Sequence, residues 1–302
     1  MAERAAAARP AAVPEDVRAG AGLEVVRPGP LTTVQDLGRR GVAHLGVPRA
    51  GALDEPALRA ANRLVGNPDG AAALETTLGG VALRALAPVL VAVTGAPAPV
   101  TVDGRPAGWG TAVRVPAGAV VEVGAATHGV RGYLAVAGGL AVPPVLGSRS
   151  ADLLSGLGPA PLAAGDRLPV GAAPAGPRAA LVPLPAPPAE LVLRLRLGPH
   201  ADWFSGVAAL ARDTYRVAAA SNRVALRTEG PAVGRARAGE LPSAGLVLGA
   251  VQVPPDGQPV IFLADHPTTG GYPVVGVVPA ADLPPAAQAR PGTPLRFLLL
   301  PG

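Results

Sequence analysis

Two polar segments, far apart in the chain, carry the side chains that are best suited to acid–base chemistry. The first contains Gln35, Asp36 and Arg39 among glycines, and the second runs from Asp265 to Tyr272. An aspartate can give or take a proton, and a guanidinium matches the oxygens of a carboxylate or a phosphate. Each segment also follows or contains a Thr-Thr pair beside its acid. We therefore predict one shared active site, at the meeting point of two halves of the protein, with Asp36 and Asp265 as catalytic residues.

The second segment is also suited to binding an anion. It follows a short apolar run that predicts a buried strand, and its adjacent glycines let backbone N–H groups approach a ligand closely. A plain hairpin loop explains the glycines equally well, so both interpretations stay open. In and near this segment, the residues that we expect to bind substrate are Gln252, Thr268, Thr269, Gly270, Gly271 and Tyr272, and from the first segment we add Gln35.

Three arginines in polar turns are candidate clamps for oxyanions. Arg39 belongs to the first segment, Arg149 follows Ser148, and Arg223 follows Asn222. We assign these three arginines to substrate binding, because a guanidinium grips carboxylates and phosphates with two hydrogen bonds. We assign the neighbouring Ser148 and Asn222 to substrate binding as well. The alternatives are structural. Residue types alone favour a local ion pair between the acid and the arginine of the first segment, and an arginine can also cap a serine-flanked turn.

The elements that position these segments are mostly strands. Forty Gly, thirty-seven Pro and only 16% charged residues indicate many short strands joined by turns. Residues 191–197 alternate cleanly between apolar and polar, and residues 255–257 predict a turn between two strands. One clear helix is expected, with Asp54 as its N-cap and Gly66 after its end.

This pattern predicts a mainly β protein built in two halves with a few short helices. An Ala- and Pro-rich stretch of low charge separates the halves, and an Ala-, Pro- and Arg-rich tail precedes them. The predicted divisions are a disordered tail at 1–22, a first half at 23–171, a linker at 172–190 and a second half at 191–302.

Composition excludes several functions. The chain of 302 residues contains no Lys, so it holds no Schiff-base lysine, no phosphate-loop lysine and no lysine that could carry biotin. Cysteine is absent, which removes disulfides, thiol nucleophiles and zinc–thiolate sites, and we predict no metal site. Three Phe, two Trp and three Tyr provide too few rings for a nucleic-acid stacking platform. No apolar stretch is long enough to span a bilayer, so we expect a soluble, cytoplasmic protein.

Several motifs together resemble one family. Residues 32–39, 146–150, 252–255 and 268–273 are similar, in order, to motifs of the biotin-dependent carboxyltransferase family, also called the allophanate hydrolase subunit 2 family. The resemblance extends from about residue 23 to residue 297. Ala50 stands where the family usually has serine, and residues 266–267 are His-Pro where a pair such as Arg-Gln is common, which affects the substrate more than the fold.

The resemblance implies cyclophilin-like β-barrels in two halves. It also implies that the chain works within a complex, because stand-alone bacterial members include the C subunit of the ATP-dependent 5-oxoprolinase and an antagonist of a histidine-kinase inhibitor. The 5-oxoprolinase opens the lactam of 5-oxoproline to glutamate, with ATP bound at a site shared with a partner. The implied partners are a protein resembling allophanate hydrolase subunit 1 and the A subunit of 5-oxoprolinase.

Three functions from different classes follow from this resemblance. The first is a 5-oxoprolinase subunit. The second is a carboxyltransferase subunit of the urea carboxylase type, whose biotin is carried by a partner because this chain has no Lys. The third is a non-catalytic regulator that relieves the inhibition of a kinase. Since the chain has neither a phosphate-binding loop nor a self-contained nucleophile, we expect it to turn over nothing on its own.

Overall fold

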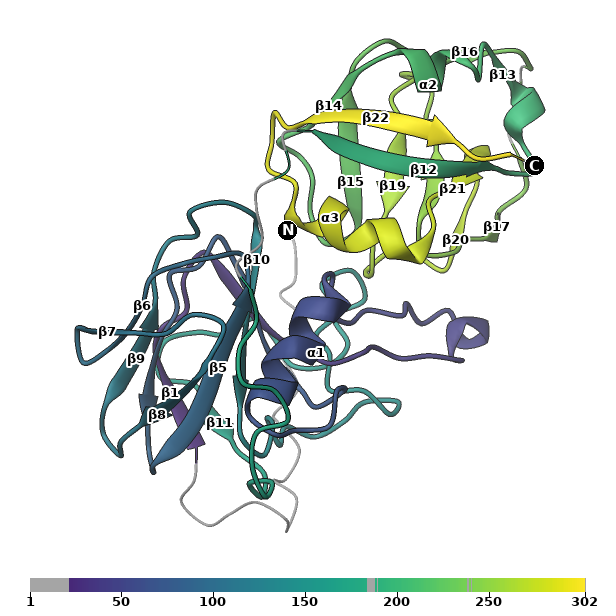
Figure 1. Cartoon of the computed structure of the whole chain (residues 1–302). Coiled ribbons are helices and arrows are strands. Elements are labelled where there is room, and N and C mark those ends of the chain that lie inside the picture. The colour runs from purple at the N-terminus through teal and green to yellow at the C-terminus, as the bar shows by residue number, and fades with distance from the viewer. Residues whose placement is uncertain (1–21, 184–187, 189, 238, 240, 302) are drawn as a thin grey trace, which may run out of the picture.

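The computed structural model describes residues 22–183, 188, 190–237, 239 and 241–301. In Figure 1 the chain forms a two-sheet half, made by β1 to β11, and a barrel half, made by β12 to β22, one above the other. The predicted tail covers residues 1–22. Residues 1–21 lie outside the described residues, and Gly22 is the first residue of β1. Residues 184–187 and 189 of the predicted linker also lie outside them.

The two-sheet half contains two antiparallel sheets around one core. Apolar side chains of both sheets, such as Leu83 and Leu134, meet in a single buried cluster. The first sheet has the order β11 (Arg167–Pro169), β1 (Gly22–Arg27), β4 (Ala82–Ala85), β9 (Val120–Val123), β6 (Val100–Val102) and β7 (Arg105–Ala107). The second has the order β2 (Leu31–Gln35), β3 (Ala73–Thr77), β10 (Arg131–Val136), β5 (Val89–Gly95) and β8 (Ala112–Val115).

One helix, α1 (Glu55–Leu64), covers the outer face of the second sheet. Its Leu58, Ala61 and Leu64 are buried in a cluster with Tyr133 of the sheet. The predicted N-cap is confirmed, because Asp54 Oδ1 accepts a hydrogen bond from the backbone of the first turn at 3.1 Å. Because α1 and the core enclose the second sheet from both sides, the middle strands of this sheet are buried on both faces.

The barrel half is a closed barrel of seven strands. The alternating segment predicted at 191–197 is its first strand, whose Leu193 and Leu195 point into the barrel core with Phe297. The order around the barrel is β12 (Leu191–Leu197), β21 (Val274–Val277), β18 (Ala250–Gln252), β19 (Val260–Phe262), β15 (Ala225–Glu229), β14 (Tyr215–Val217) and β22 (Pro294–Leu299). The predicted turn at 255–257 joins β18 and β19, which pair antiparallel.

Short elements complete the barrel half and the loop before α1. Two-stranded ladders join β13 (Phe204–Ser205) to β16 (Gly234–Arg235) and β17 (Ala244–Gly245) to β20 (Thr269–Gly270). The remaining helical turns are η1 (Ala43–Leu45), η2 (Ala201–Trp203), α2 (Ala209–Arg212), η3 (Ala280–Asp282) and α3 (Leu283–Gln288). The prediction of a mainly β fold with a few short helices is confirmed. Among the described helices, none combines the length and the apolar character that a membrane crossing requires.

The two halves are joined by specific hydrogen bonds near α3. Gln288 Nε2 donates to Asp54 Oδ2 at 2.8 Å and to the carbonyl of Arg131 at 2.9 Å. Arg290 Nε donates to the carbonyl of Gly129 at 2.8 Å. These contacts place the N-cap of α1 directly below α3, and they fix the barrel half over the second sheet (Figure 1).

Candidate functional site

Asp36, at the end of β2, is held by neutral hydrogen-bond donors. Its Oδ1 accepts from the Ser148 and Ser150 hydroxyls, both at 2.6 Å, and from the backbone N–H of Gly38 at 2.8 Å. Its Oδ2 accepts from the backbone N–H of Arg149 at 2.6 Å. The side chain is 9% exposed. Four neutral donors fix the orientation of the carboxylate without contributing a positive charge.

Two polar atoms beside this carboxylate have no partner among the described residues. Gln35 Nε2 donates to Thr33 Oγ1 and to the carbonyl of Ala151, each at 3.0 Å, which leaves the buried Gln35 Oε1 free. Arg39 donates through Nε and Nη2 to two backbone carbonyls, the second being that of Ser150, which leaves the buried Nη1 free. The side chains that carry this free acceptor and this free cationic donor therefore bind the consecutive carbonyls of Ala151 and Ser150. Buried polar atoms nearly always have a hydrogen-bond partner, so these two unpaired atoms are suited to bind a ligand.

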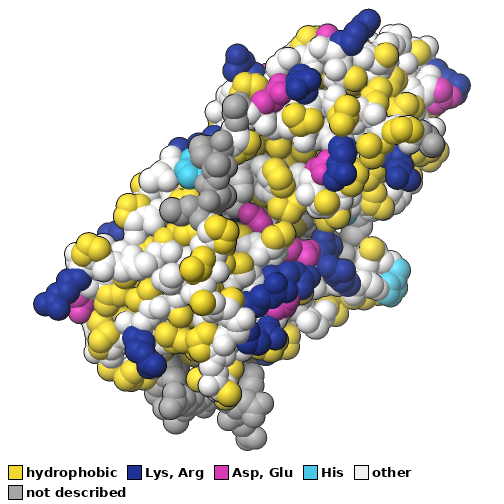
Figure 2. Space-filling model, in the orientation of Figure 1, with side chains coloured by type: hydrophobic (Ala, Val, Ile, Leu, Met, Phe, Trp, Pro, Cys, Tyr) yellow, Lys and Arg dark blue, Asp and Glu magenta, His cyan; other side chains and the backbone are white. Residues whose placement is uncertain are grey.

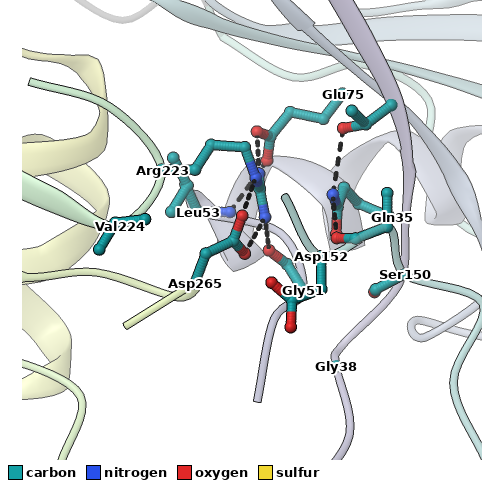
Figure 3. Close-up of polar contacts among 12 residues, drawn as sticks. Gln35, Gly38, Gly51, Leu53, Glu75, Ser150, Asp152, Arg223, Val224 and Asp265 are labelled. Carbon is teal, nitrogen blue, oxygen red and sulfur yellow. Dashed lines mark hydrogen bonds and ion pairs between the residues drawn. The ribbon is translucent and has the colours of Figure 1, made fainter. Parts of the chain in front are cut away.

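A second group of charged side chains crosses between the halves. Arg223 comes from the barrel half and is 2% exposed. Its Nε and Nη2 bind the two oxygens of Asp265 at 2.9 and 2.8 Å, Nη1 binds Glu75 of β3, and Nη2 also donates to the carbonyl of Gly51 at 2.7 Å. Figure 3 shows the guanidinium between the two carboxylates and above Gly51. The arginine thus joins the halves through charge-assisted bonds.

Burial and charge act in opposite directions on the pKa values of this group. Burial would raise the pKa of Glu75, but Arg223 and Arg131 outweigh it and hold that pKa below its ordinary value. Burial raises the pKa of Asp265 above its ordinary value, although Arg223 opposes the shift. For Arg223, burial disfavours the charge, yet Glu75 and Asp265 together hold its pKa above the ordinary value. The guanidinium therefore stays charged, and it lies between the two carboxylates that it binds.

The segment from Gly51 to Leu53 connects the two groups. Its first carbonyl accepts from Arg223, and the N–H of Ala52 donates to the carbonyl of Asp36 at 2.9 Å. Gly51 has a φ of 98°, and an added Cβ would lie 2.8 Å from the Gly38 backbone nitrogen. Only glycine fits this close approach. We call this region, where Asp36 and the Arg223 group meet, the junction.

Electrostatics also link the two groups at the junction. Burial lowers the pKa of Arg39, and the negative charges of Asp152, Asp36 and Asp265 oppose this shift. Arg39 from the first polar segment thus lies within electrostatic range of acids from both halves. The structure brings Asp36 and Asp265 to the same region of the molecule, although more than two hundred residues separate them in sequence.

The remaining residues of the predicted active site lie elsewhere. They belong to a region formed by β17, β20 and the residues around them, which we call the rim. Tyr272 is 49% exposed there, Thr269 lies in β20, and Gln252 Nε2 donates to the carbonyl of Tyr272 at 2.9 Å. Gly270 and Tyr272 line a pocket of about 510 Å³ together with His200. Gly271 lines a neighbouring hollow. Thr268 is tied to the rim because its carbonyl accepts from the backbone N–H of Leu246 at 2.9 Å. The residues of the single active site predicted from sequence are thus divided between the junction and the rim.

The predicted oxyanion roles of the arginines also require correction. Arg223 uses its guanidinium to bridge carboxylates, so it has no face left for a substrate anion. Arg149 Nε donates to the carbonyl of Val142 at 2.7 Å, and its contact with Asp36 is made by the backbone. Asn222 is exposed, and its Oδ1 accepts from two following N–H groups as in an Asx turn. Of the three arginines, only Arg39 keeps a buried N–H edge free.

Sequence reasoning left two parts of the junction unassigned. Ser150 binds Asp36 as closely as Ser148 does, and its place beside Arg149 was the available signal. Glu75 accepts from Tyr133 at 2.7 Å and from the N–H of Leu53 at 3.0 Å, as well as from Arg223. An acid inside a strand buried on both faces must find such partners, and that was its signal.

The fold and this junction define a class of protein with two β halves and a polar site between them. A family model described as "Carboxyltransferase domain, subdomain A and B" matches residues 45–299. The chain belongs to this carboxyltransferase family.

Curated relatives differ in length. The chain is 39% identical over 286 residues to the C subunit of 5-oxoprolinase from Escherichia coli, covering 91% of this chain and 90% of that protein. It is 36% identical to the protein of the same name from Haemophilus influenzae, covering 88% and 87%. It is 33% identical to urea amidolyase of Saccharomyces cerevisiae, covering 92% of this chain but 16% of that protein. The first two relatives are therefore matched along nearly their whole length.

Solved structures agree with the fold. The crystal structure of TTHA0988 has a TM-score of 0.86 and 39% identity, covering 99% of this chain and 60% of that chain. The Kluyveromyces lactis urea amidolyase structure has a TM-score of 0.86 and 31% identity, covering 93% and 19%. Both solved chains are longer, and this chain spans only part of each.

Proposed function

We propose that this chain is a subunit of an ATP-dependent 5-oxoprolinase, which opens the lactam ring of 5-oxoproline to give glutamate. The observation that carries the proposal is the match along nearly the whole length of two 5-oxoprolinase C subunits. Urea amidolyases match as well, but this chain equals less than a fifth of their length.

The two unpaired hydrogen-bonding atoms at the junction are suited to bind a lactam. A lactam presents an N–H donor and a carbonyl acceptor side by side. We assign Gln35 Oε1 to the lactam N–H and Arg39 Nη1 to the lactam oxygen, because these are a free buried acceptor and a free buried cationic donor. As the ring carbonyl is attacked, negative charge develops on that oxygen, and a positioned cation stabilises it.

Asp36 is the acid–base candidate that the geometry favours. Among the described residues its Oδ2 accepts one hydrogen bond, from the Arg149 N–H, so it has room for a further proton. Asp265 has both oxygens on Arg223, and we assign it the role of positioning that arginine across the junction.

The proposed reaction assigns ATP and the partners their roles. Transfer of the terminal phosphoryl group of ATP to the lactam oxygen releases ADP. Attack of one water on the ring carbon and cleavage of the C–N bond then give an acyl phosphate of glutamate, and a second water hydrolyses it to glutamate and phosphate. The proposed partners are a protein resembling allophanate hydrolase subunit 1 and the A subunit of 5-oxoprolinase, and the proposed location is the cytoplasm. Because the sequence has no Walker-type loop, we place ATP at a site shared with a partner.

The test is reconstitution. The chain is purified alone and with its partner subunits, and ADP and glutamate are measured with and without 5-oxoproline. We expect 5-oxoproline-dependent turnover only in the complete complex. Arg39→Gln should lower kcat by about a hundredfold, as loss of an oxyanion donor does. Arg27→Gln, at an exposed arginine paired with Glu122, is the matched control and should not change kcat. A complete complex without glutamate formation would refute the proposal.

One second function is favoured by a specific observation. The family model is a carboxyltransferase domain, and urea also places N–H groups beside a carbonyl. In that case the chain would accept a carboxyl group from biotin carried on a partner. Urea carboxylation that depends on a biotinylated partner, in the absence of 5-oxoproline turnover, would select this function. Release of a kinase from its inhibitor by the chain, without any turnover, would select the regulatory alternative.

A further inference from the structure

A cleft between the two halves lies next to the junction and shares Ala52 and Leu53 with it. Its volume is about 440 Å³. One wall comes from the two-sheet half and carries Arg40, Arg49, Glu55 and Arg59. Arg40 and Arg49 lie on either side of η1, in the segment that joins β2 to α1. The reaction proposed above gives none of these four residues a role.

The charges on this wall do not balance. The Glu55 Oε1 atom contacts Arg49 and lies 3.6 Å from Arg40, and its Oε2 atom lies 3.3 Å from Arg59. Both oxygens of the single carboxylate are therefore already in use, and three guanidiniums share one negative charge. The side chain of Arg40 is 66% exposed, so part of this positive charge faces the opening.

Neighbouring acids do not supply the missing charge. Asp69 lies 3.8 Å from Arg59, but it also pairs with Arg63 and with Arg178 at 2.8 Å. Five arginines thus surround two carboxylates along this side of α1. Figure 2 shows dark-blue side chains gathered in the middle of the face, where the halves meet, with few magenta ones among them.

The opposite wall comes from the barrel half and is apolar. Leu248, Leu263 and Leu283 belong to it, and no acid is among its described residues. Two acids adjoin this wall in sequence, and both are already paired. Asp282 makes three contacts with the Arg194 side chain, and Asp265 binds Arg223 through both oxygens. A ligand that fits both walls has an anionic group with about two negative charges and an apolar portion.

We propose that this cleft binds a phosphate group carried by a small molecule. A phosphate dianion would neutralise the surplus of three guanidiniums over one carboxylate, whereas a single carboxylate would leave one charge uncompensated. The planar fork of arginine matches phosphate oxygens with two parallel hydrogen bonds. Inorganic phosphate, an acyl phosphate and a nucleotide share this chemistry.

The site is separate from the lactam-binding atoms. It uses Arg40, Arg49 and Arg59, none of which bonds to Asp36 or Asp265 in the described residues. The binding does not depend on the proposed reaction, and it can be measured on the purified chain without turnover.

The experiment is equilibrium titration of the purified chain by calorimetry in a phosphate-free buffer of low ionic strength. Inorganic phosphate, acetyl phosphate, ADP and acetate are the four probes. We expect saturable binding of the three phosphate probes and at least about tenfold weaker binding of acetate. Tightest binding of ADP would identify a nucleotide as the source, and tightest binding of acetyl phosphate would identify an acyl phosphate. Acetate binding as tight as phosphate binding would overturn the assignment.

Charge variants make the test specific to this cleft. Arg59→Gln and Arg40→Gln should each weaken phosphate binding by about tenfold, because each removes a charge-assisted contact. Glu55→Gln should change binding in the opposite direction, since it removes the carboxylate that competes for the same guanidiniums. Arg296→Gln is the matched control, because that exposed arginine pairs with Glu190 on the barrel half and should leave binding unchanged.

The outcomes separate this site from the proposed function. Loss of phosphate binding only in the cleft variants supports the site even when the assembled complex shows no 5-oxoproline turnover. Turnover in the complex together with no saturable phosphate binding by the chain overturns the site and leaves the function standing. Equal weakening by Arg296→Gln would show a general charge effect and would also overturn the site. Circular dichroism of each variant checks that the fold is kept.

Discussion

Asp36 and Asp265 are both buried at the junction, but different partners hold them. Asp36 accepts four bonds from hydroxyl and backbone donors, none of which carries a charge. Asp265 is bound through both oxygens to a guanidinium that also binds Glu75 from the other half. Neutral donors orient a carboxylate without adding a positive charge, whereas an ion pair ties two segments together. The comparison fits the proposal that the first acid takes part in the chemistry and that the second helps to hold the two halves together.

The largest effect that this comparison predicts is on stability, at Arg223. Replacing Arg223 with Met removes the guanidinium that bonds Asp265 and Glu75 together and leaves two buried carboxylates without this partner. Breaking a buried pair in this way costs about 3–5 kcal/mol. Urea denaturation of Arg223→Met and of the unchanged chain measures the difference in the free energy of unfolding.

An exposed ion pair provides the control for this experiment. Arg296→Gln breaks the contact with Glu190, and exposed pairs contribute roughly 1 kcal/mol or less. If Arg223→Met cost no more than this control, Arg223 would not be joining the halves, and its predicted role as a substrate clamp would regain support.

The second prediction, at Asp36, concerns turnover more than stability. Asp36→Asn removes the charge while keeping the size of the side chain, and the weakened bonds to the two serines and two N–H groups should cost about 1.5–3 kcal/mol. In the assembled complex we expect kcat to fall by at least about a hundredfold, because an acid–base group of the proposed reaction is lost. Kinetics of the complex give the change in kcat, and thermal unfolding of the chain gives the change in stability.

A serine variant separates the two roles of Asp36. Ser148→Ala removes one hydroxyl donor but leaves the carboxylate charged, so it should lower stability with a smaller loss of kcat. Equal losses of kcat in Ser148→Ala and Asp36→Asn would indicate that geometry, and not proton transfer, is what Asp36 provides.

The fold was predictable to the extent that local patterns determine it. The alternating strand at 191–197, the turn at 255–257 and the cap at Asp54 all follow from residue type and spacing, and the structure contains each of them. Local pattern alone does not determine which strands close into a barrel, because the first strand, β12, pairs with β21 and β22, which are distant from it in sequence.

The candidate site was predictable in its residues but not in its partners. Asp36, Ser148 and Arg149 were selected by their polar, glycine-rich turns, yet 112 residues separate the first two, and only the fold shows that they bond. Arg223 was expected to face a ligand, but it enters the other half and meets Glu75, which is 148 residues away. Residue types do not reveal whether a charged side chain ends in solvent or across an interface.

The smallest effect is expected at the rim, and it tests whether the junction alone forms the site. Tyr272 is 49% exposed, and its described hydrogen bond uses the backbone carbonyl and not the hydroxyl. Tyr272→Ala should therefore change the free energy of unfolding by less than about 0.5 kcal/mol, as exposed substitutions usually do. We expect kcat of the complex to stay within about threefold, because the site proposed above does not contact this side chain. Gln252→Ala is the matched buried variant, since it removes the 2.9 Å bond that holds the rim backbone, and it should destabilise the chain more. A large rise in KM for 5-oxoproline in Tyr272→Ala, with stability unchanged, would place the substrate against the rim. It would then support the single active site that the sequence predicts.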